Sequence, residues 1–324
     1  MSRLILRKQE RRHLRFVQLI IRLVIWLAHL TPAPLYRLAS KLIAQSLILT
    51  NSKTVRVIQT NLTLCFPKMT KNEKRQLTFG YLTNHFFMSK QAACAWVGSR
   101  SQIEAKFANV SGQSLIHENN GKATIIAVPH IGNWEFFWHW LQLNFEAISL
   151  YSPASFKPLD NLILNARKRF GGQPFDTRPK SLIRLIKQLK QGGVMMILPD
   201  QAPKLGSGIY SPFYQHPAYT MTMLHKLVEN SGAKLLLGSC IANDKGNEYS
   251  IVVEEPEFDP QDLTLEQFNA KLNHNIETII ERNPAQYLWG YKRFKRQPAG
   301  SELYLDEIKR REKRQKKQQS RSKN

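Results

Sequence analysis

Residues 123–140 read Ala-Thr-Ile-Ile-Ala-Val-Pro-His-Ile-Gly-Asn-Trp-Glu-Phe-Phe-Trp-His-Trp, and this stretch decides the fold. Its apolar, β-branched start at residues 124–128 predicts a buried strand, which Pro129 ends. Gly132 and Asn133 supply the chemistry of a turn and of a helix N-cap, and an aromatic helical segment follows. His130 is therefore expected at the carboxyl end of a strand, the edge at which open α/β sheets bind ligands.

The surrounding segment, residues 122–255, alternates short apolar runs with helical patterns. Further strands are expected at 147–151, 194–198, 234–241 and 249–254, and helices at 159–170, 181–191, 220–231 and 265–282. This alternation predicts an α/β fold with a mostly parallel sheet flanked by helices. Residues 52–110 indicate a helical lead-in, in which Thr70 and Glu73 have the spacing of a capping box.

The composition of the 324-residue chain is strongly basic. Lys and Arg number 47 against 24 Asp and Glu, which gives a net charge of +23. Such a charge implies an anionic partner: nucleic acid, acidic lipid head groups or an acidic protein. The three cysteines, Cys65, Cys94 and Cys240, are far apart and have no CxxC spacing, so we expect reduced, buried thiols.

The N-terminal region combines a basic flank with two apolar segments. Basic residues are frequent in 3–15, and apolar stretches at 16–30 and 35–49 are separated by Pro32 and Pro34. The first stretch is shorter than the roughly 20 residues of a straight transmembrane helix. Arg22 near its middle would cost about 2.5–3.5 kcal/mol on insertion unless it snorkels or pairs. We expect membrane attachment by a tilted span or an interfacial helix; a helix pair packed on the core is the alternative.

These patterns divide the chain into three parts. Residues 1–50 are expected to form membrane-associated helices, 51–306 an α/β domain with its helical lead-in, and 307–324 a basic, disordered tail. The tail is equally compatible with a solvated end and with a tether to anionic phospholipid.

The pair His130 and Glu135 is the candidate for the chemical centre. Histidine accepts a proton near neutral pH because its ordinary pKa is about 6.5. The turn at Gly132 and Asn133 reverses the chain, so Glu135 is expected to return toward His130 and orient its imidazole.

Other polar residues are expected to line the same cleft. Asp200 and Gln201 follow the strand at 194–198 and face the same sheet edge, although an N-cap or turn would explain them too. Arg167 and Arg169, before Gly171 and Gly172, are candidates for binding a phosphate or carboxylate. Asn133 completes the set of predicted substrate-binding residues.

Several site classes have no support in the sequence. The GxGxxG, GxxxxGK[ST] and GxSxG motifs are absent from the 324 residues, which argues against nucleotide-binding and serine-hydrolase functions. His139 has neither HExxH spacing nor a cysteine partner, so we expect no metal and no cofactor. A base, an orienting acid and oxyanion donors suffice for acyl transfer from a thioester to a hydroxyl.

Five motifs in order resemble the late acyltransferases of bacterial lipid A biosynthesis, the lauroyl/myristoyl group. The densest is Pro129 to Glu135, which contains the HxGNWE form of the family's histidine-x4-acid element. The other matching residues are Arg56, Asn61, Leu62, Phe66 and Pro67; Arg167, Arg169 and Gly171; Asp200, Gln201, Gly208, Phe213, Ala218 and Thr220; and Pro284, residues 286–289 and residues 293–295.

The resemblance implies a glycerolipid-acyltransferase-like fold at the inner membrane, with the active site facing the cytoplasm. It also implies transfer of a fatty acyl group from acyl carrier protein to a hydroxyl of a phosphorylated lipid A precursor. By this resemblance His130 is the base and Glu135 its partner, Arg167 and Asp200 are cleft residues, and Arg169 and Gln201 are secondary candidates. The positive charge then suits the acidic carrier protein, the phosphorylated lipid and an anionic membrane surface.

Two alternatives remain open from the sequence. The same chemistry serves another acceptor lipid or an acyl-CoA donor. A membrane-tethered, basic nucleic-acid-binding protein would also explain the charge, but the sequence lacks a helix-turn-helix or RNA-recognition pattern, so no specific nucleic acid is expected.

Overall fold

The computed structural model describes residues 17–119, 121–151, 157–298 and 303–304. The basic N-terminal flank and the tail at 307–324 lie outside the described residues, so their predicted roles stay predictions.

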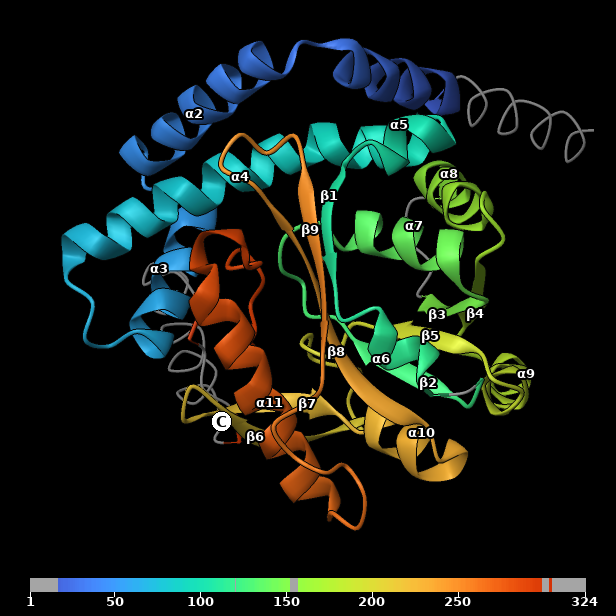
Figure 1. Ribbon diagram of the computed structural model, residues 1–324. Helices are drawn as coiled ribbons and strands as arrows, with labels where there is room; N and C mark the ends of the chain where they lie inside the picture. The colour runs from blue at the N-terminus through green and yellow to red at the C-terminus, as the bar shows by residue number, and fades with distance from the viewer. Residues whose placement is uncertain (1–16, 120, 152–156, 299–302, 305–324) are drawn as a thin grey trace, which may run out of the picture.

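A seven-stranded sheet forms the centre of the molecule (Figure 1), in the order β1-β9-β8-β2-β5-β3-β4. Its strands are β1 (Phe107–Ser111), β2 (Thr124–Ala127), β3 (Ala147–Tyr151), β4 (Gln173–Asp176), β5 (Val194–Ile197), β8 (Lys234–Ala242) and β9 (Tyr249–Glu254). Strands β8, β2, β5, β3 and β4 are parallel to one another. Strand β9 is antiparallel to β8, and β1 is parallel to β9. The predicted mostly parallel α/β fold is confirmed.

Helices cover both faces of this sheet. They are α3 (Lys53–Cys65), α4 (Lys71–Val97), α5 (Arg100–Glu104), α6 (Ser114–His117), α7 (Trp134–Asn144), α8 (Lys157–Lys168), α9 (Pro179–Lys190), α10 (Met223–Ser231) and α11 (Leu265–Arg282). In β2, Ile125 and Ala127 enter the core shared with α9, α10 and α11, while Ile126 enters the core shared with α7. Alternate residues therefore bury opposite faces, which explains why the strand is apolar throughout.

Two N-terminal helices, Val17–Leu30 and α2 (Ala33–Leu49), lie along one side of the molecule next to α4 (Figure 1). Lys90 of α4 donates hydrogen bonds to the carbonyls of Ala28 and His29, at 3.0 and 2.8 Å, and so caps the first helix with a positive charge. Within the described part of the chain, no single helix is long and apolar enough to cross a membrane. The two helices pass that test of length and composition only together, with a bend of 110° between them.

The structure differs from the sequence-based expectations in several strands. Strand β1 begins at Phe107, inside the lead-in expected to be helical to residue 110, and β4 was not expected. Both are edge strands, and β1 is mostly exposed, so neither leaves a long apolar run in the sequence. The hairpin β6 (Gly208–Phe213) and β7 (His216–Met221) was not expected. It includes Thr220 and Met221, which were predicted to begin the helix at 220–231. That helix, α10, begins at Met223 because Thr220 and Met221 pair with β6. The three cysteines are free and buried, as predicted.

The loop after β2 is held by backbone contacts to two other segments. Gly132 donates to the Gln286 carbonyl at 3.0 Å, Asn133 donates to the Cys240 carbonyl at 2.8 Å, and Leu288 donates to the His130 carbonyl at 3.0 Å. Gly132 has φ +55°, and a Cβ there would lie 1.9 Å from the Cys240 oxygen. Only glycine allows the loop to approach β8 this closely.

Gly132→Ala should therefore destabilise the protein much more than Gly232→Ala. Gly232 also has a positive φ, +63°, but a Cβ there has no neighbour within 4 Å. Its replacement should cost only the left-handed strain of about 1–2 kcal/mol, whereas Gly132→Ala adds a clash with backbone. Urea denaturation of the two variants measures the difference, and equal losses in the free energy of unfolding would contradict this explanation.

Candidate active site

The register of the sheet brings His130 and Asp200 together. Strands β2 and β5 pair in parallel, with Ala127 opposite Ile197. His130 and Asp200 each lie three residues beyond that pair, so both emerge at the carboxyl edge of the sheet. The two residues are 70 positions apart in the chain, and strand pairing alone makes them neighbours.

Asp200 binds His130 with both carboxylate oxygens. Oδ1 lies 2.6 Å from Nδ1 of the imidazole, and Oδ2 accepts the His130 backbone N–H at 3.0 Å. The Asp200 side chain is almost fully buried, at 2% exposure, while that of His130 is 14% exposed. Burial opposes ionisation of Asp200, but the charge and hydrogen bonds of His130 hold its pKa below the ordinary value.

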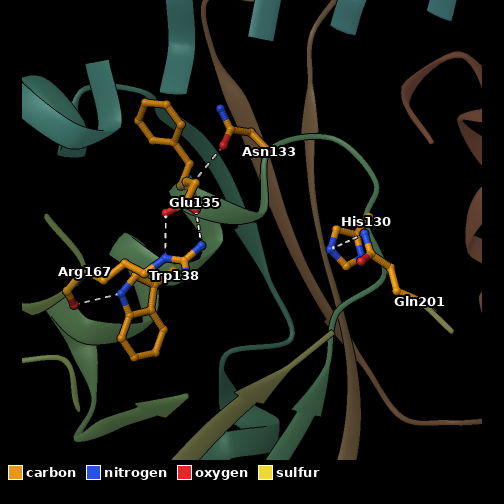
Figure 2. Close-up of polar contacts among 7 residues, drawn as sticks. His130, Asn133, Glu135, Trp138, Arg167 and Gln201 are labelled. Atoms are coloured by element: carbon orange, nitrogen blue, oxygen red, sulfur yellow. Dashed lines mark hydrogen bonds and ion pairs between the residues drawn. The ribbon is translucent and has the colours of Figure 1, made fainter. Parts of the chain in front are cut away.

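The second imidazole nitrogen faces Gln201. Its Nε2 lies 3.1 Å from the side-chain nitrogen of Gln201 (Figure 2). A carboxylate on Nδ1 favours the tautomer in which Nδ1 carries the proton, so Nε2 accepts from the amide. Nε2 is then the nitrogen able to take a proton from a substrate.

The expected contact between Glu135 and His130 is replaced by another. Glu135 is the second residue of α7, and its carboxylate turns to Arg167 of α8, as Figure 2 shows. Arg167 Nε donates to Oε2 at 3.2 Å, and a second bond joins Nη2 to Oε1. Glu135 is therefore paired with Arg167, and Asp200 occupies the orienting position predicted for Glu135.

The Glu135–Arg167 pair joins two helices in a mostly buried place. The Glu135 side chain is 7% exposed and that of Arg167 is 23% exposed. Burial opposes ionisation of Glu135, but the charge and hydrogen bonds of Arg167 keep its pKa below the ordinary value. Trp138 of α7 also donates to the Arg167 carbonyl at 2.9 Å, which links the helices a second time.

Two further predicted residues have internal partners. Asn133 is buried and caps α7 by accepting from the Phe136 N–H at 3.3 Å, while its amide nitrogen lies 3.3 Å from the Tyr249 hydroxyl. Arg169 donates to the carbonyls of Trp96 and Gly98, at 3.2 and 2.6 Å, at the end of α4. The structure thus brings His130, Asp200 and Gln201 into one cluster. Glu135 and Arg167 form a separate pair, and Arg169 binds the end of α4.

Sequence reasoning did not assign a role to Tyr287 and Arg293, although both belong to the closing motif. Arg293 is buried and donates to the Tyr219 carbonyl and the Thr220 hydroxyl, each at 2.8 Å, and its charge helps to lower the pKa of Asp200. Burial and the negative charge of Asp200 raise the pKa of Tyr287 well above its ordinary value. A buried arginine some 90 residues from the aspartate leaves no local signal in the sequence.

A narrow hollow reaches His130 from the side of α4. Trp134 packs edge-on against the imidazole, with 5.0 Å between ring centres. The hollow is lined by Tyr81, Asn84, His85, Met88, His130, Trp134, Ala285, Gln286 and Leu288. The hollow has no room for a water-sized molecule, so a substrate that reaches the imidazole from this side must displace its lining side chains.

These features define an α/β protein in which a buried carboxylate holds a histidine at the carboxyl edge of a mostly parallel sheet. Residues 5–296 match the family described as "Bacterial lipid A biosynthesis acyltransferase", and the chain belongs to that family.

Curated relatives carry corresponding names. The chain is 27% identical over 281 residues to the lipid A biosynthesis lauroyltransferase of Escherichia coli K12, covering 86% of this chain and 90% of that protein. It is 27% identical over 246 residues to a lipid A biosynthesis acyltransferase of Haemophilus influenzae, covering 75% and 78%. Identity to the E. coli lipid A biosynthesis palmitoleoyltransferase is 24% over 258 residues, covering 77% and 81%.

Breaking the Glu135–Arg167 pair should be costly. Glu135→Gln leaves the Arg167 charge without its carboxylate in a largely desolvated place and should lower the free energy of unfolding by on the order of 3 kcal/mol. The double variant Glu135→Gln with Arg167→Met should recover part of that loss, because no uncompensated charge remains.

Arg100→Gln is the control for this series, because it breaks an exposed Arg100–Glu104 pair. That change should cost less than about 1 kcal/mol. Urea denaturation measures all of these variants. A double variant that is no more stable than Glu135→Gln would contradict this explanation.

Proposed function

We propose that this chain transfers a fatty acyl group from acyl carrier protein to a hydroxyl of a phosphorylated lipid A precursor. The observation that carries the proposal is the His130–Asp200 pair at the carboxyl edge of the sheet, in a chain that belongs to the lipid A acyltransferase family. The names of the relatives support the acceptor class.

The proposed reaction needs one base and no covalent enzyme intermediate. Nε2 of His130 removes the proton from the acceptor hydroxyl as the hydroxyl displaces the Gln201 amide. The oxygen attacks the thioester carbonyl carbon, a C–O bond forms, and the C–S bond breaks as the tetrahedral intermediate collapses. The imidazolium then returns its proton to the leaving thiolate, so the base is regenerated.

In this mechanism Asp200 stabilises the imidazolium that forms and fixes the ring through Nδ1. Arg293 and Tyr287 act through Asp200: the arginine charge favours the ionised carboxylate, and both side chains hold its surroundings in place. Glu135 acts through the position of Arg167, and not through a proton on His130.

The proposed donor and acceptor both suit the charge of the protein. The net charge of +23 favours encounter with an acidic carrier protein and with a phosphorylated lipid. An acyl-CoA donor or another acceptor lipid, with the same chemistry, is the alternative.

The proposed location is the inner membrane, with the active site on the cytoplasmic side. The two N-terminal helices support attachment because they expose large apolar side chains. These are Leu19, Ile20, Leu23, Val24, Trp26, Leu27, Leu30, Leu35, Leu38, Leu42, Ile43 and Leu49, each at least 45% exposed. A bent pair with this surface suits insertion into one leaflet.

His130→Ala and Asp200→Asn should lower turnover with acyl carrier protein thioester and a lipid A precursor. Loss of a general base removes about 10²–10⁴-fold, and Asp200→Asn should approach that loss because Nδ1 loses its carboxylate. Lys187→Gln changes an exposed side chain of α9, is the control and should keep full turnover. Mass spectrometry of the acylated product measures the rates.

Unchanged turnover in both active-site variants would overturn the mechanism. Replacing the acyl carrier protein thioester by acyl-CoA tests the proposed donor. Turnover with the carrier protein thioester should be at least tenfold more efficient at low salt. A preference for acyl-CoA would select the alternative donor, and lipid profiles of cells with and without the protein identify the acceptor.

Leu38→Gln with Leu42→Gln should weaken binding to vesicles at least tenfold. Both side chains are more than half exposed on one face of α2, and burying each in lipid contributes about 1.5–3 kcal/mol. Ile183→Gln with Leu205→Gln removes two side chains elsewhere that are at least as exposed and serves as the control. Flotation with phospholipid vesicles measures both, and equal binding of the two variants would contradict attachment through α2.

A further inference from the structure

A groove of about 570 Å³ lies between the first described helix, the end of α4 and α8. Leu19, Leu23 and Trp26 form its wall on Val17–Leu30, and Trp96 and Leu162 form the facing wall. Arg22, Asn165 and Arg169 also line it, and we call this the arginine groove. Its volume is in the range of ligand-binding pockets.

The walls of the arginine groove are fixed from within the protein. Lys90 caps the end of Val17–Leu30 and holds that helix against α4. Arg169 holds the last turn of α4 through the carbonyls of Trp96 and Gly98. The groove is therefore formed by elements with defined contacts to one another.

The charge of the arginine groove is not balanced by its own lining. Two guanidinium groups line it, and its lining contains no acidic side chain among the described residues. Burial lowers the pKa of Arg169, which shows that its charge is partly desolvated. An apolar groove with two cations and the Asn165 amide complements a ligand with an apolar chain and an anionic head.

The arginine groove is separate from the hollow at His130. Both lie along α4, but Met88 lines the hollow whereas Trp96 lines the groove. At 1.5 Å per residue, these two positions are about 12 Å apart along the helix. A polar hollow of about 230 Å³, lined by Gln18, Arg22, Asn161, Leu162 and Asn165, adjoins the groove and shares Arg22, Leu162 and Asn165 with it.

We propose that the arginine groove binds one anionic phospholipid of the bilayer, with an acyl chain between Leu23, Trp26 and Trp96 and the phosphate at Arg22 and Asn165. The apolar surface of Val17–Leu30 is continuous with the groove, so the chain reaches it from the membrane side. The phosphate also provides a partner for Arg22, the one charge in the middle of this apolar helix. The bound lipid joins the N-terminal helix to α8, whose Arg167 is paired with Glu135.

The test is native mass spectrometry of the full chain in detergent, titrated with phosphatidylglycerol or with phosphatidylcholine of the same acyl chains. The wild type should bind one phosphatidylglycerol at least tenfold more tightly than phosphatidylcholine. Arg22→Gln with Asn165→Asp lowers the charge by two at the groove and should abolish that preference. Lys187→Gln with Lys190→Gln lowers the charge equally, at two exposed side chains of α9, and should bind like the wild type.

Asn165→Asp alone keeps the shape of an exposed side chain, so it tests the proposal even if the double variant misfolds. It should weaken phosphatidylglycerol binding severalfold while leaving the melting temperature of the lipid-free protein unchanged. Equal affinity for the two lipids, or wild-type binding by both groove variants, would overturn the proposal. Stoichiometric displacement of the lipid by an acyl carrier protein thioester would also overturn it, because the groove would then be an acyl-donor site.

Discussion

The bidentate contact of Asp200 with His130 is the constraint on which the site depends. One carboxylate oxygen fixes the imidazole and the other fixes the backbone at the end of β2. A one-residue slip between β2 and β5 would move Asp200 away from the ring, so the register of the central sheet is also the register of the site. The apolar strands, buried on both faces, stabilise that register. The charge of Arg293 helps to keep the Asp200 carboxylate ionised at the sheet edge.

The residues of the HxGNWE motif have different structural roles. His130 is the proposed base, while Gly132 allows the loop to approach Cys240 with a positive φ. Asn133 caps α7. Glu135 uses the positive end of the same helix and pairs with Arg167, which ties α7 to α8. The motif thus fixes the histidine, a loop and a helix start together, and the carboxylate that binds the histidine comes from the end of another strand.

Periodicity in the sequence predicted most of the sheet, because buried strands and amphipathic helices leave local patterns of hydrophobicity. It also placed Asp200 at the correct sheet edge. The choice of Glu135 as partner was wrong because a five-residue spacing suggested proximity, whereas strand pairing decides which carboxylate meets the ring. The β6–β7 hairpin is local, but its turn residues Tyr214 and Gln215 have positive φ without the glycine or asparagine that usually marks such a turn. The role of Arg293 depends on contacts distant in sequence, which no local pattern of charge or hydrophobicity reports.

The central claim is that Asp200, and not Glu135, holds the proton-bearing Nδ1 of His130. NMR of the protein with ¹⁵N-labelled histidine tests it most directly, because a hydrogen-bonded Nδ1 proton gives a downfield signal and the ring nitrogens report the tautomer. The account predicts an Nδ1–H tautomer whose signal is lost in Asp200→Asn and retained in Glu135→Gln. Loss of the signal in Glu135→Gln with retention in Asp200→Asn, in folded proteins, would contradict it.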